Sequence, residues 1–544
     1  MRKRKLWLLL MTSILLVLLL AGLYTYEIYK DYSVPVPYTD RVMGIPIVDD
    51  LDFLNEKKKL TSDCNPGVYF EQTLMPYSSD GTLYLSQNYQ MEEWVGEIVT
   101  GSRDAFLCTL PDDAWADKAD SIRSNHVFKL WMVGEDSYYE LNLVVSGMPI
   151  MNITTEREEP QDLGDYDTDP DRYYFDPDII WYGKMQLFNP GVGVTQYEIT
   201  ETAVKRYLRG NSSSYYEKKS YSLGLLDSEG GNLNVSLLGM RSDNKWKLKS
   251  MVADTSRVRE KTACQIWELF DQSNPDVDQP GPRMEYVELI MDNDYVGIFG
   301  LVEPVDEKKL SLDENDVLYK TTDWIIPEDK AFQDVINKKW KINSFIRIRY
   351  PDPVIDYERA WYPMRDYLNT FYHSLSGSGQ AEDRLNLPNT VDMLLFNMTI
   401  TGCDNYFKNI YFAADVNDDG TYTMRQIPWD LDLTFGELAD GSFNDDVGVI
   451  FEERAIPYLR ETNPDLVGPL LQERWEECRD TFLATDNILD ILYSNMEYII
   501  DSGAAERENV RWPDYRMSVD LEAIQDYQIR RMRWLDEYFI NEPD

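Results

Sequence analysis

The segment Thr401–Glu437, "TGCDNYFKNIYFAADVNDDGTYTMRQIPWDLDLTFGE", constrains the fold more than any other stretch of the chain. Two strand-like runs flank the acidic turn "DVNDDG", a pattern that is typical of a β-hairpin. Asp404 and Asn409 come before or at the start of the first run, and Asp430 and Asp432 follow the second. Because a hairpin brings its two outer ends together, we expect these polar side chains to meet. Asp430 and Asp432 should share one face, since alternate residues of a strand do.

Phosphoryl transfer needs this kind of arrangement. Protein kinases place a base Asp and a metal-binding Asn five residues apart on one loop, and they supply a second metal-binding Asp further along the chain. On that interpretation Asp404 accepts the proton of a hydroxyl nucleophile, while Asn409 and Asp430 bind Mg²⁺ with support from Asp432. The same pattern also fits turn caps and a solvated acidic edge, and the spacing alone leaves both interpretations open.

The hairpin turn also resembles the first half of a calcium-binding EF-hand loop. Gln426 stands where that loop needs a bidentate Glu, and strand-like runs flank the turn where an EF-hand has helices. The sequence therefore favours an ordinary Asp-Gly hairpin turn over a calcium site.

The segment Lys205–Leu225, "KRYLRGNSSSYYEKKSYSLGL", offers a second group of phosphate-binding candidates. A Gly-Asn-Ser-Ser turn between two strand-like runs can point backbone N–H groups at phosphate, and a lysine of the following strand can reach the same anion. Taken alone, the segment equally describes a polar hairpin with solvated lysines. The candidates are the turn and its flanking residues: Arg209, Gly210, Asn211, Ser212, Lys218 and Lys219.

The formal net charge of −43 over 544 residues excludes nucleic acid as an expected partner, because so acidic a surface repels phosphate backbones. It should attract cations and basic peptides. The chain has only two histidines, which excludes a His-rich metal site. Its five cysteines are widely spaced and lack a C-x-x-C pair, so neither a zinc knuckle nor a dense disulfide framework is expected.

The N-terminus predicts a membrane anchor. Residues 6–23 form an uncharged, Leu-rich run of eighteen residues after the basic stretch "MRKRK", a length that covers most of a ~30 Å hydrocarbon core. The positive-inside rule places the N-terminus in the cytoplasm and the rest of the chain outside the membrane. A cleaved signal peptide is the alternative, although its apolar region would be unusually long and no clean cleavage site follows.

We expect three parts along the chain: a basic tip and anchor at 1–30, a linker and small β-rich module at 31–146, and a large α+β domain at 147–544. Short alternating runs with turns predict the β-rich module. In the large domain, residues 305–385 have the character of an insertion with helices and Pro breaks, and helical patterns fill the C-terminal part.

Four motifs in order resemble the CotH family, bacterial spore-coat-type proteins regarded as atypical protein kinases. They are "RGNSS…KKSY", "LLGMRSDNKWKLKSMVADTSRVRE", "YVELIMDNDYVGIFGLVEPV" and "DNYFKNIYF…PWDLDLTFG". The resemblance covers roughly residues 147–440. It implies an atypical kinase-like α+β fold that binds ATP and Mg²⁺, with Mn²⁺ as a possible substitute, and that phosphorylates Ser or Thr of surface or coat proteins.

The resemblance also carries residue roles. Arg209 to Ser213 correspond to the RGNSS loop, and Lys218 and Lys219 to the lysine pair after it. Of the two we favour Lys219 for the phosphates, because its face also carries Tyr221 and Leu223. Arg259 matches the arginine at a helix start, and Glu303 an acidic residue near the nucleotide. The chain departs from the family with Glu217 in place of a Pro and Glu260 after Arg259 in place of an Asn.

The resulting hypothesis is a membrane-anchored, extracytoplasmic CotH-type kinase whose substrate is a basic, Ser-containing protein. The alternative is a non-catalytic surface, coat-assembly or adhesion protein with the same fold. Retention of every expected acidic metal ligand favours the enzyme.

Overall fold

The computed structural model describes residues 40–160, 179–191, 196–210, 215–275, 277–335, 339, 341–342, 345–373, 380–438 and 440–541. The predicted anchor at 1–30 and three residues of the predicted phosphate loop, Asn211, Ser212 and Ser213, lie outside these ranges. Within them, none of the helices has both the length and the apolar character that crossing a membrane requires.

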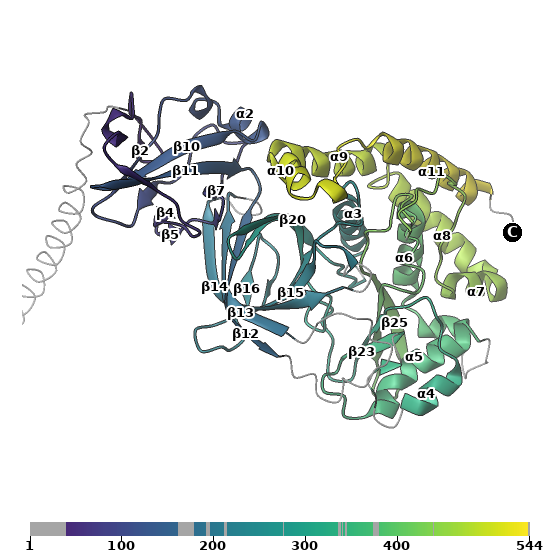
Figure 1. The fold of residues 1–544 in the computed structure, drawn as a ribbon. Coiled ribbons are helices and arrows are strands. Elements are labelled where there is room, and N and C mark those ends of the chain that lie inside the picture. Colours follow the sequence, from purple (N-terminus) through teal and green to yellow (C-terminus); the bar gives the residue numbers. More distant parts are fainter. Residues whose placement is uncertain are drawn as a thin grey trace, which may run out of the picture.

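The predicted β-rich module is present at the N-terminal end of the described chain (Figure 1). Its largest sheet has the order β6-β7-β11-β10-β9, with β3 paired to β11, and a three-stranded sheet has the order β5-β4-β8. Its elements are β1 (Arg41–Val42), β2 (Ile45–Pro46), β3 (Lys58–Leu60), β4 (Val68–Phe70), β5 (Thr73–Leu74), β6 (Tyr77–Ser78), β7 (Thr82–Ser86), β8 (Ile98–Thr100), β9 (Phe106–Cys108), α2 (Lys118–Arg123), β10 (Val127–Val133) and β11 (Ser137–Ser146).

Seven strands then form a closed barrel in the order β12-β13-β14-β15-β18-β20-β19. Alternate side chains fill it, so Trp246 and Leu248 lie inside while Lys247 and Lys249 of the same strand point outward. The strands are β12 (Ile150–Pro160), β13 (Ile179–Asn189), β14 (Glu198–Arg209), β15 (Ser220–Leu226), β18 (Lys245–Lys249), β19 (Met284–Met291) and β20 (Asp294–Val302), beside a small pair, β16 (Val235–Ser236) and β17 (Ser242–Asp243).

A second sheet carries the hairpin that the sequence predicted. Its order is β22-β23-β21-β24-β25, formed by β21 (Val317–Thr321), β22 (Lys341–Ile342), β23 (Ile346–Tyr350), β24 (Ile410–Val416) and β25 (Tyr422–Pro428). Strand β21 lies between β23 and β24, so the segment that resembled an insertion supplies the middle of this sheet. The same segment supplies α4 (Asp329–Val335) and α5 (Tyr357–Phe371). The described residues of this segment are therefore integral to the core.

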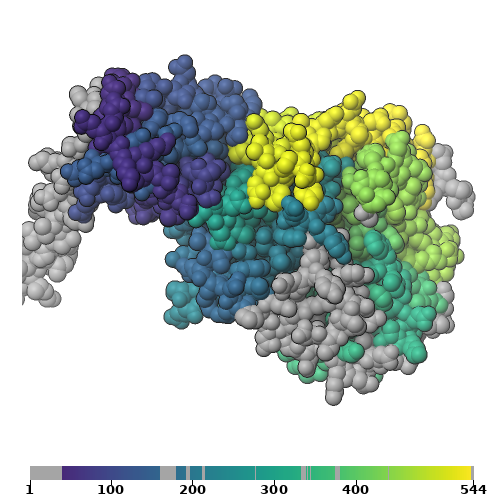
Figure 2. All heavy atoms as spheres, in the orientation of Figure 1, coloured from purple at the N-terminus to yellow at the C-terminus, as the bar shows by residue number. Residues whose placement is uncertain are grey.

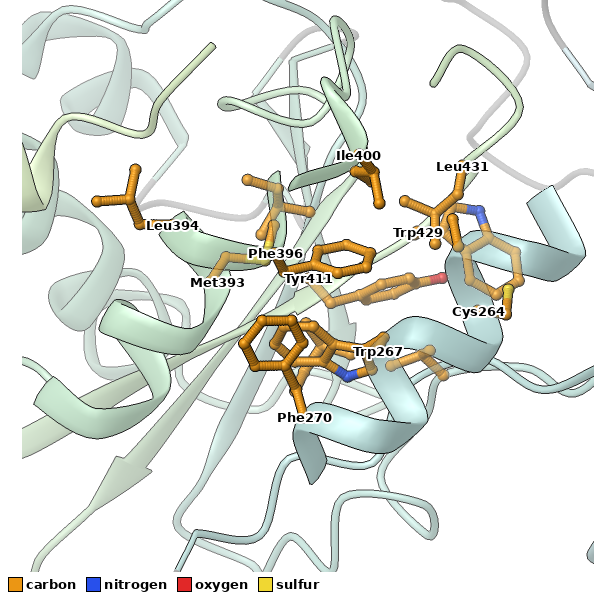
Figure 3. Close-up of a cluster of buried hydrophobic side chains, with 14 of the residues drawn as sticks. Cys264, Trp267, Phe270, Met393, Leu394, Phe396, Ile400, Tyr411, Trp429 and Leu431 are labelled. Atoms are coloured by element: carbon orange, nitrogen blue, oxygen red, sulfur yellow. The ribbon is translucent and has the colours of Figure 1, made fainter. Parts of the chain in front are cut away.

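Helices complete the α+β architecture. The helix predicted after "DTSRV" is α3 (Arg259–Ser273), and the C-terminal helices are α6 (Leu387–Ile400), α7 (Ala455–Thr462), α8 (Pro464–Arg479), α9 (Thr485–Asp501), α10 (Ala504–Arg511) and α11 (Glu522–Asn541). In the buried cluster of Figure 3, Trp267 of α3 packs edge-on against Phe396 of α6, with ring centroids 5.0 Å apart. Trp429 and Leu431, which flank Asp430 in the sequence, belong to the same cluster. The core therefore fixes the backbone on both sides of Asp430.

Buried ion pairs join α10 to the barrel. Arg507 binds both carboxylate oxygens of Glu288 at 2.7 Å, and Glu508 accepts from Lys218 Nζ at 2.6 Å and from the backbone N–H of Ile298 at 2.9 Å. Arg507 also donates to Asn125 of the N-terminal module. In Figure 2 the yellow C-terminal segment accordingly lies against both the module and the barrel.

Arg507→Leu should lower the free energy of unfolding by about 3–5 kcal/mol, because it leaves the carboxylate of Glu288 buried without its partner. Urea denaturation of the full-length chain measures the loss. The matched control is Arg123→Leu, which removes an exposed arginine paired with Asp501 and should leave the urea midpoint almost unchanged. Equal midpoints for the two variants would contradict the account of this junction.

Candidate functional site

The loop between α6 and β24 carries the predicted base. It leaves α6 through Thr401, whose φ of 53° is left-handed, and it reaches β24 at Ile410. Asn405 holds this loop to the end of β25, because its Nδ2 donates to the carbonyl of Trp429 at 2.8 Å. The backbone N–H of Trp429 donates in turn to the carbonyl of Asn409 at 2.9 Å. These bonds bring Asp404, Asn409 and Asp430 together from the two ends of the hairpin.

Asp404 is almost wholly buried, with 3% of its surface exposed. Its Oδ2 accepts from Lys408 Nζ at 2.6 Å and from Asn409 Nδ2 at 3.4 Å. Its Oδ1 is buried and accepts no hydrogen bond from the part of the chain that the structure describes. Burial raises the pKa of Asp404 above the ordinary range of an aspartate, and the Lys408 ammonium partly opposes that rise. A buried carboxylate with one unused oxygen and a raised pKa is suited to accept a proton.

Asp430 lies two residues after the end of β25. Both Asp430 and Asn409 adopt left-handed backbone conformations, with φ of 58° and 59°, and such non-Gly positions concentrate at functional sites. The Asp430 carboxylate is 39% exposed, and its Oδ1 accepts from Lys249 Nζ at 2.6 Å. Although burial acts in the opposite direction, the charges of Lys249, Arg209 and Lys320 hold the pKa of Asp430 well below its usual range. This carboxylate is therefore ionised and open to a cation.

Asp432 lies close enough to Asp430 for the two carboxylates to interact. Both residues follow the end of β25 at Pro428, and Asp430 has a left-handed backbone, so the strand alternation expected from the sequence does not place them on one face. Burial raises the pKa of Asp432 well above its usual range, and the nearby carboxylates of Asp430 and Glu260 raise it further. A bound dication would favour its ionised form, since opposite charge lowers the pKa of a carboxyl group.

A lysine–glutamate pair that the sequence reasoning missed completes the site. Lys249, at the end of β18, forms an ion pair with Glu260 in the first turn of α3, and both side chains are buried. Burial disfavours the charged amine, but Asp430 and Glu260 raise the pKa of Lys249 well above its usual range. One ammonium thus links β18, α3 and the end of β25.

Strand counting could have found this pair. Kinases place their phosphate lysine on the third strand, and its glutamate partner lies on the next helix. The predicted phosphate loop joins β14 to β15. Counted from β14 along the chain, and leaving out the two-residue strands β16 and β17, β18 is the third strand. Glu260, noted in the sequence as a departure from the family, is the partner of that lysine.

The lysine pair Lys218–Lys219 is placed differently from what the sequence suggested. Lys218 is fully buried, and its Nζ donates to Glu508 and to the carbonyl of Ile298, both at 2.6 Å. The structure therefore does not bring Lys218 to Asp430. Burial lowers the pKa of Lys218 to about 8. Lys219 is half-buried at the start of β15, and its phosphate role stays a prediction.

The sequence favours Lys219 because Tyr221 and Leu223 share its face, but the structure shows that these two residues face the barrel interior. Leu223 packs inside the barrel with Tyr221 against it, whereas Ser222 lies opposite Lys247 on the outer face. Within β15 the face of Tyr221 and Leu223 is therefore the interior face, and Lys219 precedes the strand, so alternation does not place its side chain.

Arg259 and Glu303 have structural partners. Arg259 pairs with Asp254 at 2.5 Å and with Glu437 at 3.0 Å, which ties the start of α3 to the loop after Asp432. The Glu303 carboxylate accepts from the backbone N–H of Arg241 at 2.7 Å and pairs with Lys309. Both residues position the backbone around the site.

Arg209 is close enough to the site for its charge to act on Asp430. It ends β14, and its charge helps to lower the pKa of Asp430. Gly210 follows with a φ of 104°, a conformation that a residue with a Cβ rarely adopts.

The donor set fits a magnesium ion that shares its ligands with phosphate. No group of three or more His, Cys, Asp or Glu side chains within the described ranges is arranged to hold a metal ion by itself. Magnesium commonly takes only one or two carboxylates and completes its octahedron with water and phosphate oxygens. Asp430 and the amide oxygen of Asn409 are ligands of that kind.

Lys408→Met should raise the pKa of Asp404 further, because it removes the ammonium that opposes the effect of burial. Carboxyl ¹³C NMR of chain labelled at aspartate measures this pKa, with Asp404→Asn identifying the signal. Lys408→Arg retains the charge and should leave the midpoint close to that of the wild type. An unchanged or lower midpoint in Lys408→Met would contradict the assignment.

Comparison with known proteins identifies the family of the chain. A search of curated proteins returned no match. A family model described as CotH kinase protein matches residues 207–535, which include the end of β14, Lys249, Glu260, Asp404 and Asp430. Because the match spans more than half of the 544 residues, the chain belongs to the CotH kinase protein family.

Proposed function

We propose that this protein is an atypical protein kinase that transfers the γ-phosphoryl group of ATP to Ser or Thr hydroxyls of other proteins. The observation that carries the proposal is the ammonium of Lys249 held between Glu260 and Asp430. Active protein kinases need a strand lysine paired with a helix glutamate and a metal-binding aspartate in place together. Family membership supports the same class of activity.

Each residue would have one role. Lys249 would bind oxygens of the phosphate chain as a positioned positive charge. Asp430 and Asn409 would hold Mg²⁺, or Mn²⁺ in its place, with Asp432 in support. The metal ion would neutralise charge on the phosphates.

Asp404 would orient the acceptor hydroxyl and take its proton through the unpaired Oδ1. Lys408, bound to Oδ2, would keep the carboxylate in place and ionised before transfer.

The setting of the enzyme is part of the proposal. The apolar run at 6–23 would anchor the chain in a membrane as a single pass with its N-terminus in the cytoplasm and the α+β domain outside the cell. The net charge of −43 would attract a basic, Ser-containing surface or coat protein as substrate and disfavour nucleic acid.

Radiolabel transfer from γ-labelled ATP to a basic, Ser-rich protein tests the proposal directly. The purified full-length chain with Mg²⁺ or Mn²⁺ should incorporate label, and Asp404→Asn or Asp430→Asn should each slow incorporation by about 100-fold or more, through loss of the base or of a metal ligand. Asp418→Asn is the matched control, since it changes an exposed aspartate in the turn of the same hairpin and should leave the rate unchanged.

Absence of transfer together with absence of a nucleotide-dependent change in melting temperature would contradict the kinase proposal. That result would favour the alternative, a surface or coat-assembly protein that uses the same fold without catalysis.

A further inference from the structure

Basic side chains concentrate at the junction of the barrel and the second sheet, although the chain as a whole carries a net charge of −43. Besides Lys249, four cations are close enough to influence one another's ionisation or that of Asp430: Arg209, Lys247, Lys320 and Arg349. None of these four forms an ion pair with a carboxylate in the described part of the chain. We call these four residues the cationic cluster.

The barrel contributes two members on one face. Arg209 lies opposite Ser220 across β14 and β15, and Ser222 lies opposite Lys247 across β15 and β18. Directly opposed residues and alternate residues of a strand share a face, so Arg209, Lys247 and Lys249 all project from the outer wall of the barrel. The serines between them are small, and Lys247 Nζ donates to Ser222 Oγ at 2.9 Å.

The second sheet contributes the other two. Lys320 of β21 lies beside Tyr411 of β24, and its Nζ is 5.1 Å from the ring centroid of Trp429. Lys249 Nζ is 4.8 Å from the same ring, so the indole of Trp429 serves both ammonium groups and holds them near Asp430. Arg349 of β23 is exposed at the edge of the group.

Lys247 lies where the base of a bound nucleotide would be expected. It is two residues from Lys249, or about 6.6 Å along the strand, and it pairs with Val302 at the end of β20. A nucleotide whose phosphates lie at Lys249 and Asp430 and which extends along β18 would thus reach Lys247 and the segment Glu303–Pro304. The side chain that meets it there is a lysine, not a small apolar group.

Three polar groups of Glu303–Pro304 already have partners within the protein. The N–H of Glu303 donates to the carbonyl of Arg283 at 3.1 Å, and its carboxylate binds Arg241 and Lys309. Pro304 has no N–H, and its carbonyl accepts from Arg241 at 3.3 Å. Base discrimination depends on hydrogen-bonding groups that a wrong base would leave unpaired, and here the N–H and carboxylate of Glu303 and the carbonyl of Pro304 already have partners within the protein.

We propose that this site recognises its phosphoryl donor by the phosphate chain and not by the base. The donor class is then any nucleoside triphosphate, and inorganic tripolyphosphate binds the same cluster. This inference rests on the proposed function, because it describes the donor of that reaction.

The charge state of the cluster agrees with this specificity. Burial and the neighbouring charges of Arg209, Arg349 and Lys245 lower the pKa of Lys247 to about 7. Cations held together without carboxylate partners repel one another, and a polyphosphate relieves that repulsion more than a neutral base does.

Competition binding tests the proposal. The purified full-length chain with Mg²⁺ is loaded with a ribose-labelled fluorescent ATP, and unlabelled ATP, GTP, CTP, tripolyphosphate and adenosine are titrated against it. We expect the three triphosphates and tripolyphosphate to displace the label with midpoints within about threefold of one another, and adenosine to displace none at millimolar concentration. Lys247→Met should weaken all four anions alike by about tenfold, the size of one charge-assisted contact.

Two controls accompany that variant. Lys247→Arg keeps the charge and should stay within about threefold of wild type, and Lys58→Met, an exposed lysine of β3 in the N-terminal module, should bind as wild type does. ATP binding more than tenfold tighter than GTP and CTP, or displacement by adenosine, would overturn the proposal and leave the kinase function standing. Failure of every nucleotide and of tripolyphosphate to bind would overturn both.

Discussion

The ammonium of Lys249, held between Glu260 and Asp430, is the interaction on which the rest of the site depends. A buried charge is costly unless it is paired, so the amine requires both carboxylates to be near, and they come from different elements. Glu260 can reach the amine only if α3 packs against the barrel. Asp430 can reach it only if the β24–β25 hairpin ends beside β18. The core around Trp267, Trp429 and Leu431 provides that packing, and Arg259 ties α3 to the loop after Asp432. The packing of the core therefore places the charged residues of the site.

Charge is distributed unevenly in this protein. A net charge of −43 would by itself repel a nucleotide. The cationic cluster gathers four basic side chains at one junction, beside the ion pairs of Lys249 with Glu260 and Asp430. The surrounding protein screens charges there less than water does. We infer that the acidic exterior selects basic protein substrates, whereas the basic junction selects polyphosphates.

Part of this site could be predicted from the sequence, because the residues concerned are close together along the chain. Asp404, Asn409 and Asp430 lie at the two ends of one hairpin, so their proximity follows from a turn signal and strand alternation. The pair Lys249–Glu260 needs the strand order of the barrel and the docking of α3, neither of which a local pattern contains. Lys218 was a candidate for the phosphates beside the favoured Lys219, because both follow the glycine turn closely, yet the Lys218 amine pairs with Glu508, a residue of α10. In the same way the segment of β21 and β23 resembled an insertion, because both strands are short and β21 pairs only with strands that follow much later in the chain.

A structure of the chain with Mg²⁺ and a non-hydrolysable ATP analogue would test the central claim most directly. The account predicts that the phosphate chain contacts Lys249 Nζ, that the metal ion is bound by Asp430 and Asn409, and that the γ-phosphate faces Oδ1 of Asp404. Phosphates bound at Lys219 with no contact to Lys249, or a metal ion bound away from Asp430, would contradict it.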